Sequence, residues 1–208
     1  MTTMPGRHLP RRIAQLLIGL FLYGIGIAFI VRGEIGAAPW DVLTQGIARH
    51  VPLSFGVITV LTSVVVLLLW FPLRQKPGAG TLLNVLLVGP AADVGLALIP
   101  PGQPLWLRIL FFAIGLTVLS AATGLYIGAQ FGAGPRDGLM TGLHARTGWP
   151  VWVVRTGLEV TVVTAGWILG GDVGVGTLAF ALLVGPLCQH FLRLFAVEVD
   201  LPRRAPTS

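Results

Sequence analysis

The sequence predicts an all-α membrane protein with six transmembrane helices in two inverted three-helix repeats. Each repeat is expected to carry a re-entrant or interfacial half-helix after its first span. Three observations predict this fold class: the composition, six apolar runs of spanning length, and a pattern that repeats after 96 residues. Of the 208 residues, 54% are hydrophobic and only 11% are charged, and the mean hydropathy is +0.84. These values lie outside globular usage.

The first apolar run, residues 13–31, follows three arginines and so resembles a secretory signal. Its length of about 19 residues exceeds that of a signal core, and no small-x-small cleavage site precedes Arg32. We therefore expect a retained first helix.

Two short polar phrases share one pattern, GAAPWD at 36–41 and GAGPRD at 132–137. The amphipathic pieces after them, 42–50 and 138–146, are too short to cross a bilayer. Proline is favoured in the first turn of a helix, so each piece is predicted as a half-helix that begins near Pro39 or Pro135.

The remaining apolar runs have spanning length. They cover residues 53–71, 79–99, 108–129, 150–170 and 175–196. Tryptophans fall close to the predicted span ends, as in an aromatic belt: Trp70, Trp106, Trp149, Trp152 and Trp167.

A tandem duplication relates the two halves of the chain. GAGTLLNVLLVGP at 78–90 aligns with GVGTLAFALLVGP at 174–186 and matches at nine of thirteen positions. The prediction is one membrane domain over 1–208, with repeats of about 12–100 and 108–196 and a short cytoplasmic tail at 200–208. Because each repeat crosses three times, the second repeat is expected to enter the membrane from the opposite side.

Basic residues support this inverted topology with both termini in the cytoplasm. The segments expected inside hold Arg7, Arg11, Arg12, Arg74, Lys76, Arg136, Arg146, Arg193, Arg203 and Arg204. Those expected outside hold only Arg32, Arg49 and Arg108. Membrane orientation therefore accounts for the formal net charge of +6, and no nucleic-acid partner is expected.

Motifs for enzymatic chemistry are missing from the sequence. The four histidines are scattered without ligand spacing, and Cys188 is the only cysteine, which we interpret as a small core residue. There is no nucleophile elbow, metalloprotease helix or phosphate-binding loop. We expect no enzyme activity, no metal and no cofactor.

The repeated phrases are the first candidate site. Half-helices at matching positions of an inverted repeat can meet at the bilayer midplane, where their positive N-terminal ends would face a cavity beside Asp41 and Asp137. In the alternative, each aspartate only caps its own helix, and the half-helices lie flat at the two surfaces.

Arg136 replaces Trp40 at the equivalent position of the second phrase. It could pair with Asp41 across the repeat axis or add its guanidinium to a helix N-terminus to form an anion pocket. A position at the cytoplasmic rim, where it serves only orientation, is the third interpretation.

Charged residues inside a predicted span form the second candidate site. Arg155 and Glu159 are four residues apart and can pair on one helix face, either as a structural clamp or in substrate or proton coupling. Their counterparts in the first repeat are Thr59 and Ser63. The candidate substrate- or ion-binding residues are therefore Pro39, Asp41, Asn84, Pro135, Arg136, Asp137, Arg155 and Glu159.

With GAAPWDVL, RQKPGAGTLLNVLLVGP, GAGPRDGL and GVGTLAFALLVGP in view, the sequence resembles the YczE/YyaS/YitT family of bacterial integral membrane proteins. The resemblance runs from about Arg12 to Phe195, and the short tail is similar to the YczE branch. It implies a multi-pass protein of the bacterial inner membrane. Transport is commonly supposed for this family.

The function expected from these features is a small-solute transporter or channel with a midplane site between the half-helices. The alternative is a membrane accessory or assembly partner that transports nothing. The expected partners are the lipid bilayer, an unidentified small solute, and a second copy of the chain or another membrane protein.

Overall fold

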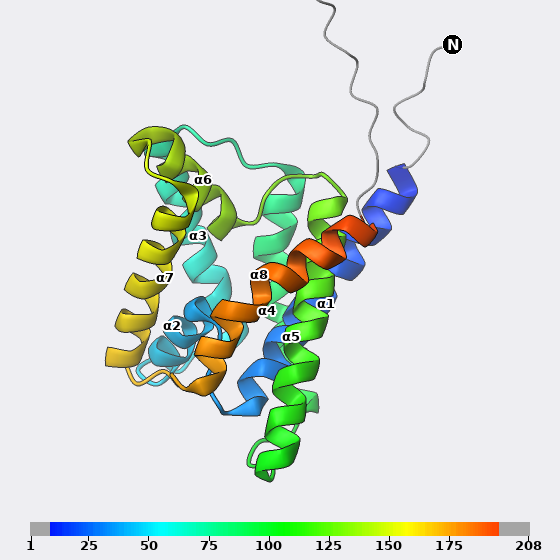
Figure 1. Cartoon of the computed structure of the whole chain (residues 1–208), viewed down its shortest axis with the longest axis vertical. Helices are drawn as coiled ribbons and strands as arrows, with labels where there is room; N and C mark the ends of the chain where they lie inside the picture. Colours follow the sequence, from blue (N-terminus) through cyan, green and yellow to red (C-terminus); the bar gives the residue numbers. More distant parts are fainter. Residues whose placement is uncertain (1–8, 196–208) are drawn as a thin grey trace, which may run out of the picture.

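The computed structural model describes residues 9–195, and every element in that range is a helix (Figure 1). The helices are α1 (Leu9–Gly33), α2 (Pro39–Ala48), α3 (Phe55–Leu73), α4 (Ala79–Leu98), α5 (Leu105–Gly128), α6 (Pro135–Thr147), α7 (Val151–Ile168) and α8 (Val175–Phe195). The predicted tail at 200–208 lies outside the described residues.

Six of these helices are long and apolar enough to cross a membrane, as predicted: α1, α3, α4, α5, α7 and α8. The other two, α2 and α6, contain 10 and 13 residues and follow the first long helix of each half. They begin at Pro39 and Pro135, where the sequence predicted them, because proline suits a first turn whose N–H has no helical partner.

Local structure repeats with the same spacing as the sequence. Each helix from α5 to α8 begins 96 residues after its counterpart among α1 to α4. The glycines that open the two phrases also match, since Gly36 has a φ of 118° and Gly132 a φ of 120°. Side chains with a Cβ rarely adopt this conformation, so glycine allows the sharp turn into each half-helix.

The centre of the molecule is the contact between α1 and α5, which small residues bring close together. Added methyl groups at Gly26 and Gly115 would press on Leu119 and Ile30 of the opposite helix. Leu20 and Ile27 are fully buried beside this crossing. Close backbone approach is typical of packing between membrane helices.

The other helices surround this central pair in a definite order. α4 packs on α1, α8 packs on α5, and each half-helix packs on the third helix of the other half, α2 on α7 and α6 on α3. α3 also packs on α4, but no comparable contact joins α7 to α8. Among residues 9–195, the ring of packed helices is therefore interrupted at the seam between α7 and α8.

Candidate functional site

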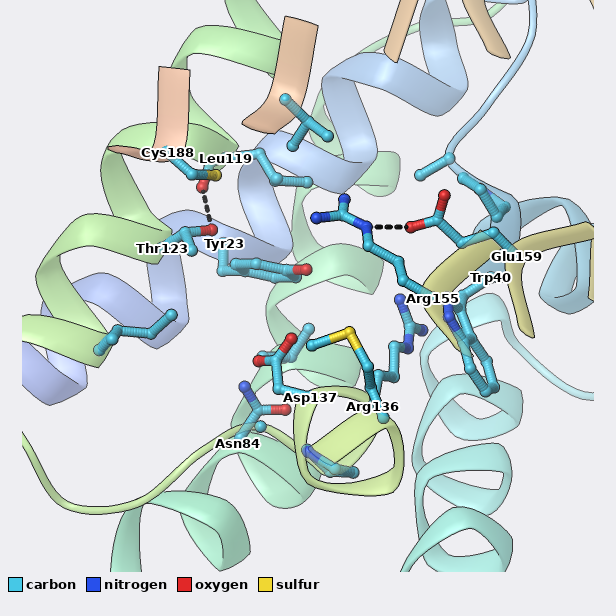
Figure 2. A pocket seen from close by; sticks show the side chains of 18 of the residues that line it. Tyr23, Trp40, Asn84, Leu119, Thr123, Arg136, Asp137, Arg155, Glu159 and Cys188 are labelled. Carbon is cyan, nitrogen blue, oxygen red and sulfur yellow. Dashed lines mark hydrogen bonds and ion pairs between the residues drawn. The ribbon is translucent and has the colours of Figure 1, made fainter. Parts of the chain in front are cut away.

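One cavity of about 580 Å³ lies inside the helix bundle, and all eight helices contribute to its wall (Figure 2). The structure brings all the sequence-predicted site residues together in this wall: Pro39, Asp41, Asn84, Pro135, Arg136, Asp137, Arg155 and Glu159. The N-terminal ends of α2 and α6 therefore face the same space, although they are 96 residues apart in the chain.

Asp41, in the first turn of α2, is the most deeply buried charged group of the site. Its exposed fraction is 1%, and neither carboxylate oxygen has a hydrogen-bond partner. The Nη1 atom of Arg136 lies 3.7 Å from Asp41 Oδ1, too far for a good hydrogen bond but close enough for an ion pair. Of the three alternatives for Arg136, the structure thus has the ion pair with Asp41 of the other half.

Burial raises the pKa of Asp41 to about 6, because a buried carboxylate loses its hydration, and the Arg136 cation opposes this rise. Arg136 also lies over the ring of Trp40, with its guanidinium carbon 5.1 Å from the ring centroid. Trp40 and Arg136, which occupy matching positions of the two halves, therefore contact each other in the folded chain.

Asp137 occupies the corresponding place in α6 but has a different partner. Its Oδ2 atom accepts a hydrogen bond of 2.9 Å from the hydroxyl of Tyr126. Tyr126 in turn packs edge-to-face on Tyr23, with ring centroids 5.9 Å apart. Burial raises the pKa of Asp137, while the Tyr126 hydrogen bond and Arg136 lower it.

Trp70 anchors the start of α6. Its indole Nε1 donates a 2.9 Å hydrogen bond to the carbonyl oxygen of Pro135, and its ring covers Gly138, where an added methyl group would collide with it. Trp70 is 4% exposed, so its prediction as an aromatic-belt residue is wrong: it serves packing instead. The other four predicted belt tryptophans are exposed: Trp106, Trp149, Trp152 and Trp167.

Arg155 and Glu159 form the ion pair that their spacing on α7 predicted. Arg155 Nε lies 2.8 Å from Glu159 Oε1, and the side chains are 45% and 27% exposed. Figure 2 shows the far end of the Arg155 guanidinium turned away from Glu159 and into the cavity. The pair therefore leaves donors of Arg155 available on the cavity side.

Sequence reasoning missed several residues of the wall. The chain has only two tyrosines, Tyr23 and Tyr126, and both line the cavity; two hydroxyl-bearing rings within apolar helices were a usable signal. Cys188, interpreted as a small core residue, packs partly against the core and also lines the cavity. Gln189 lies beside it on α8.

The arrangement unites two carboxylates at positive helix ends, a third carboxylate from Glu159 and two guanidiniums around one cavity. Such groups can hold an ionic or polar solute, because helix N-termini and guanidiniums bind anionic groups while carboxylates bind cations or protons. Fold and site together define a multi-pass helical membrane protein with a charged internal cavity.

The chain belongs to the family of unknown function DUF6198, whose profile matches residues 10–193. It is 39% identical over 192 residues to an uncharacterized protein of Haemophilus influenzae, covering 92% of this chain and 88% of that protein. It is 32% identical over 178 residues to the uncharacterized membrane protein YczE of Bacillus subtilis, covering 84% and 82%.

A second Bacillus subtilis relative is the uncharacterized protein YyaS, which is 26% identical over 179 residues, covering 84% of this chain and 89% of that protein. These relatives confirm the resemblance inferred from the motifs. No solved structure matches the chain.

Proposed function

We propose that the protein transports a small solute across the bacterial inner membrane through this cavity. The observation that carries the proposal is the placement of Asp41: a carboxylate that is 1% exposed and accepts no hydrogen bond, at the start of a half-helix inside a membrane bundle. Ionised groups at membrane depth are costly and usually serve a pathway for ions or substrates.

The transport cycle would use the duplicated architecture. In this proposal the two halves are inverted repeats with cytoplasmic termini, and the cavity alternates between the two sides as one half moves against the other. The contacts of α2 with α7 and of α6 with α3 support the proposal, because each half contributes a half-helix to the other half. The protein acts as a carrier and carries out no covalent chemistry.

Asp41 and Asp137 are assigned different tasks by their surroundings. Asp41 has an ion-pair partner and no hydrogen bond, so a solute or proton that approaches it can compete with Arg136. Asp137 is held by the Tyr126 hydroxyl and forms a fixed part of the wall. Asp41 is therefore the group that binds and releases the coupled ion or solute.

Electrical recording on purified protein in proteoliposomes tests the proposal. Transport currents on a solid-supported membrane are measured for a panel of small organic anions, amino acids and cations. We expect at least one solute to give a current, and Asp41→Asn to lower it at least tenfold. The matched control is Asp172→Asn, at an exposed carboxylate outside the cavity, which should retain the current.

Two results would count against a transporter. One is a complete panel without current in folded protein, and the other is an unchanged current in Asp41→Asn combined with Asp137→Asn. Either result would favour the accessory-protein alternative, in which the cavity only supports assembly with another membrane protein.

A further inference from the structure

In the part of the chain that the structure describes, the cavity reaches the seam between α7 and α8. Contacts run from α8 through α5, α1 and α4 to α3, and from there through α2 and α6 to α7. Between α7 and α8 no comparable contact closes the ring, although residues of both helices line the cavity. In Figure 1, α7 stands at the left and α8 runs diagonally from the lower middle to the upper right, and a short loop joins their lower ends.

The equivalent seam in the first half is held shut by a specific set of contacts. Asp93 of α4 accepts hydrogen bonds from Ser54 Oγ, at 2.5 Å, and from Gly56 N, at 2.7 Å. Gly56 also lies directly against Gly89, because an added methyl group at either glycine would collide with the carbonyl oxygen of the other. We call these four residues the α3–α4 clasp.

The second half lacks this clasp, position by position. Pro150, Trp152 and Gln189 stand where the clasp has Ser54, Gly56 and Asp93. Pro150 has no hydroxyl group to donate the hydrogen bond that Ser54 donates to Asp93. Trp152 carries an indole side chain where Gly56 has only a hydrogen atom. Gly185 occupies the position that matches Gly89, but an added methyl group at Gly185 would meet nothing within 4 Å.

α7 and α8 expose more of their apolar surface than the other spanning helices. The share of buried residues in the apolar stretch of each spanning helix is 17% for α7 and 22% for α8. It is 33% to 44% for the other four spanning helices. Val160, Leu178 and Leu182 are among the exposed side chains of these two helices. A lateral opening between such helices faces hydrocarbon, because both are long and apolar enough to cross the bilayer.

Two arginines direct hydrogen-bond donors into the cavity. Arg155 uses Nε for Glu159, and the end of its guanidinium points into the cavity, as does that of Arg136 (Figure 2). The wall also has apolar side chains, among them Leu119 of α5 and Phe180 and Val184 of α8. The cavity thus combines two guanidiniums, which three carboxylates of the same wall offset, with apolar side chains from α5 and α8.

We propose that the solute is an anionic amphiphile that enters from the bilayer between α7 and α8. Its acidic group binds Arg136 and Arg155, and its hydrocarbon part lies against the apolar side chains of α5 and α8 and extends through the seam. This inference rests on the proposed function, since it names the class of solute that the same cavity takes.

Cys188 offers a direct test, because the chain has one cysteine and it lines the cavity. In proteoliposomes at pH 7.5, Cys188 is modified either with pyrenyl maleimide, which partitions into lipid, or with a sulfonated maleimide present on both sides. Each rate is divided by the rate in the unfolded chain. We expect pyrenyl maleimide to react with Cys188 at least tenfold faster than the charged reagent on this scale.

Two single-cysteine variants calibrate the labelling. In a Cys188→Ser background, Leu182→Cys at an exposed position marks full access from lipid, and Ala92→Cys at a fully buried position marks no access. Equal or faster labelling of Cys188 by the sulfonated reagent would overturn the lateral opening, as would labelling as slow as that of Ala92→Cys.

Protection of the same thiol tests the class of solute. We expect decanesulfonate in the bilayer to slow the labelling of Cys188 at least fivefold and decanol at the same mole fraction to leave it unchanged. The protection should fall below twofold in Arg155→Gln and in the charge-neutral pair Asp41→Asn with Arg136→Gln. Arg49→Gln, at an exposed arginine outside the cavity, should retain it.

Equal protection by decanol, or full protection in Arg155→Gln, would overturn the anionic class. Size-exclusion profiles and labelling of Leu182→Cys in each variant show that the protein is folded. The labelling needs no transport, so a protein that shows protection without any transport current would disprove the proposed function and leave the binding site in place.

Discussion

The two halves of the chain, residues 9–98 and 105–195, contain the same helices at the same spacing but differ where their last two helices meet. In the first half Asp93 and a pair of facing glycines hold α3 to α4. In the second half Trp152 stands in place of Gly56, and α7 and α8 lie apart. The last two helices are therefore packed together in the first half and not in the second.

Charge follows the same division. Arg136 replaces Trp40, and Arg155 with Glu159 replaces Thr59 with Ser63, so the second half carries the added ionic groups. The glycine-proline phrases that start the half-helices are kept in both halves. The repeated elements therefore set the framework, while substitutions at matching positions give the cavity its polarity.

The contacts of the two half-helices also differ between the halves. Trp70 of α3 covers Gly138 of α6, whereas at the equivalent contact Gly166 of α7 lies against the backbone of α2 at Val42 and Leu43. An indole ring therefore fills the first contact, and the second brings two helix backbones close together.

The largest effect is expected where the halves contact each other electrostatically. Arg136→Gln removes the only cation within 4 Å of Asp41 among the described residues and leaves a buried carboxylate unpaired. We expect the free energy of unfolding to fall by about 3–5 kcal/mol at pH 8, measured by reversible SDS unfolding in mixed micelles. The variant has an uncharged residue at position 136, as the first half has Trp40 at the matching position.

The pH dependence of this variant follows from the raised pKa of Asp41. Without the cation that opposes desolvation, the pKa rises above about 6, so the folded state holds its proton more tightly than the unfolded state. Stability should therefore be kept at low pH and lost as pH rises through the folded pKa. Asp41→Asn with Arg136→Gln should remove both the loss and its pH dependence; a double variant as unstable as Arg136→Gln would contradict the ion-pair explanation.

A smaller effect is expected at matched glycines of the two seams. Gly89→Ala forces a methyl group against the carbonyl oxygen of Gly56, and overpacking of this kind costs about 1–3 kcal/mol. At Gly185→Ala the methyl group meets nothing within 4 Å, so helix propensity alone should stabilise the protein by about 0.5–1 kcal/mol. Thermal unfolding in detergent measures both.

These two variants distinguish a packed seam between α7 and α8 from an unpacked one. Equal losses at both glycines would mean that α8 is packed against α7 in the membrane as α4 is against α3. An unchanged stability of Gly89→Ala would mean that the α3–α4 clasp does not hold the first seam.

Much of the framework was predictable from the sequence, because its causes are local. Apolar length sets the six spans, and the prolines at 39 and 135 fix where the half-helices begin. The repeated half-helices also linked Asp41 and Arg136 to one potential site, because half-helices at matching positions of an inverted repeat can meet at the bilayer midplane.

Features that depend on contacts between distant helices were not predictable. The role of Trp70 depends on Gly138, 68 positions away, so its place near a span end wrongly suggested a membrane-surface residue. The seam likewise depends on whether two glycines face each other. Gly89 and Gly185 lie in the same motif, and only the neighbouring helix makes one of them a contact and leaves the other open.

The smallest effect is expected at the exposed end of the α2–α7 contact, where Arg49 Nη2 lies 2.9 Å from Asp172 Oδ1. Both side chains are about half exposed, so water and salt screen the pair. Arg49→Gln should lower the free energy of unfolding by about 0.2–1 kcal/mol, and the loss should shrink as salt is raised from 0.05 M to 0.5 M. SDS unfolding at the two salt concentrations measures this. A loss above 2 kcal/mol that salt does not change would mean that this pair is as shielded as the one between Asp41 and Arg136, and the contrast between surface and cavity charges would fail.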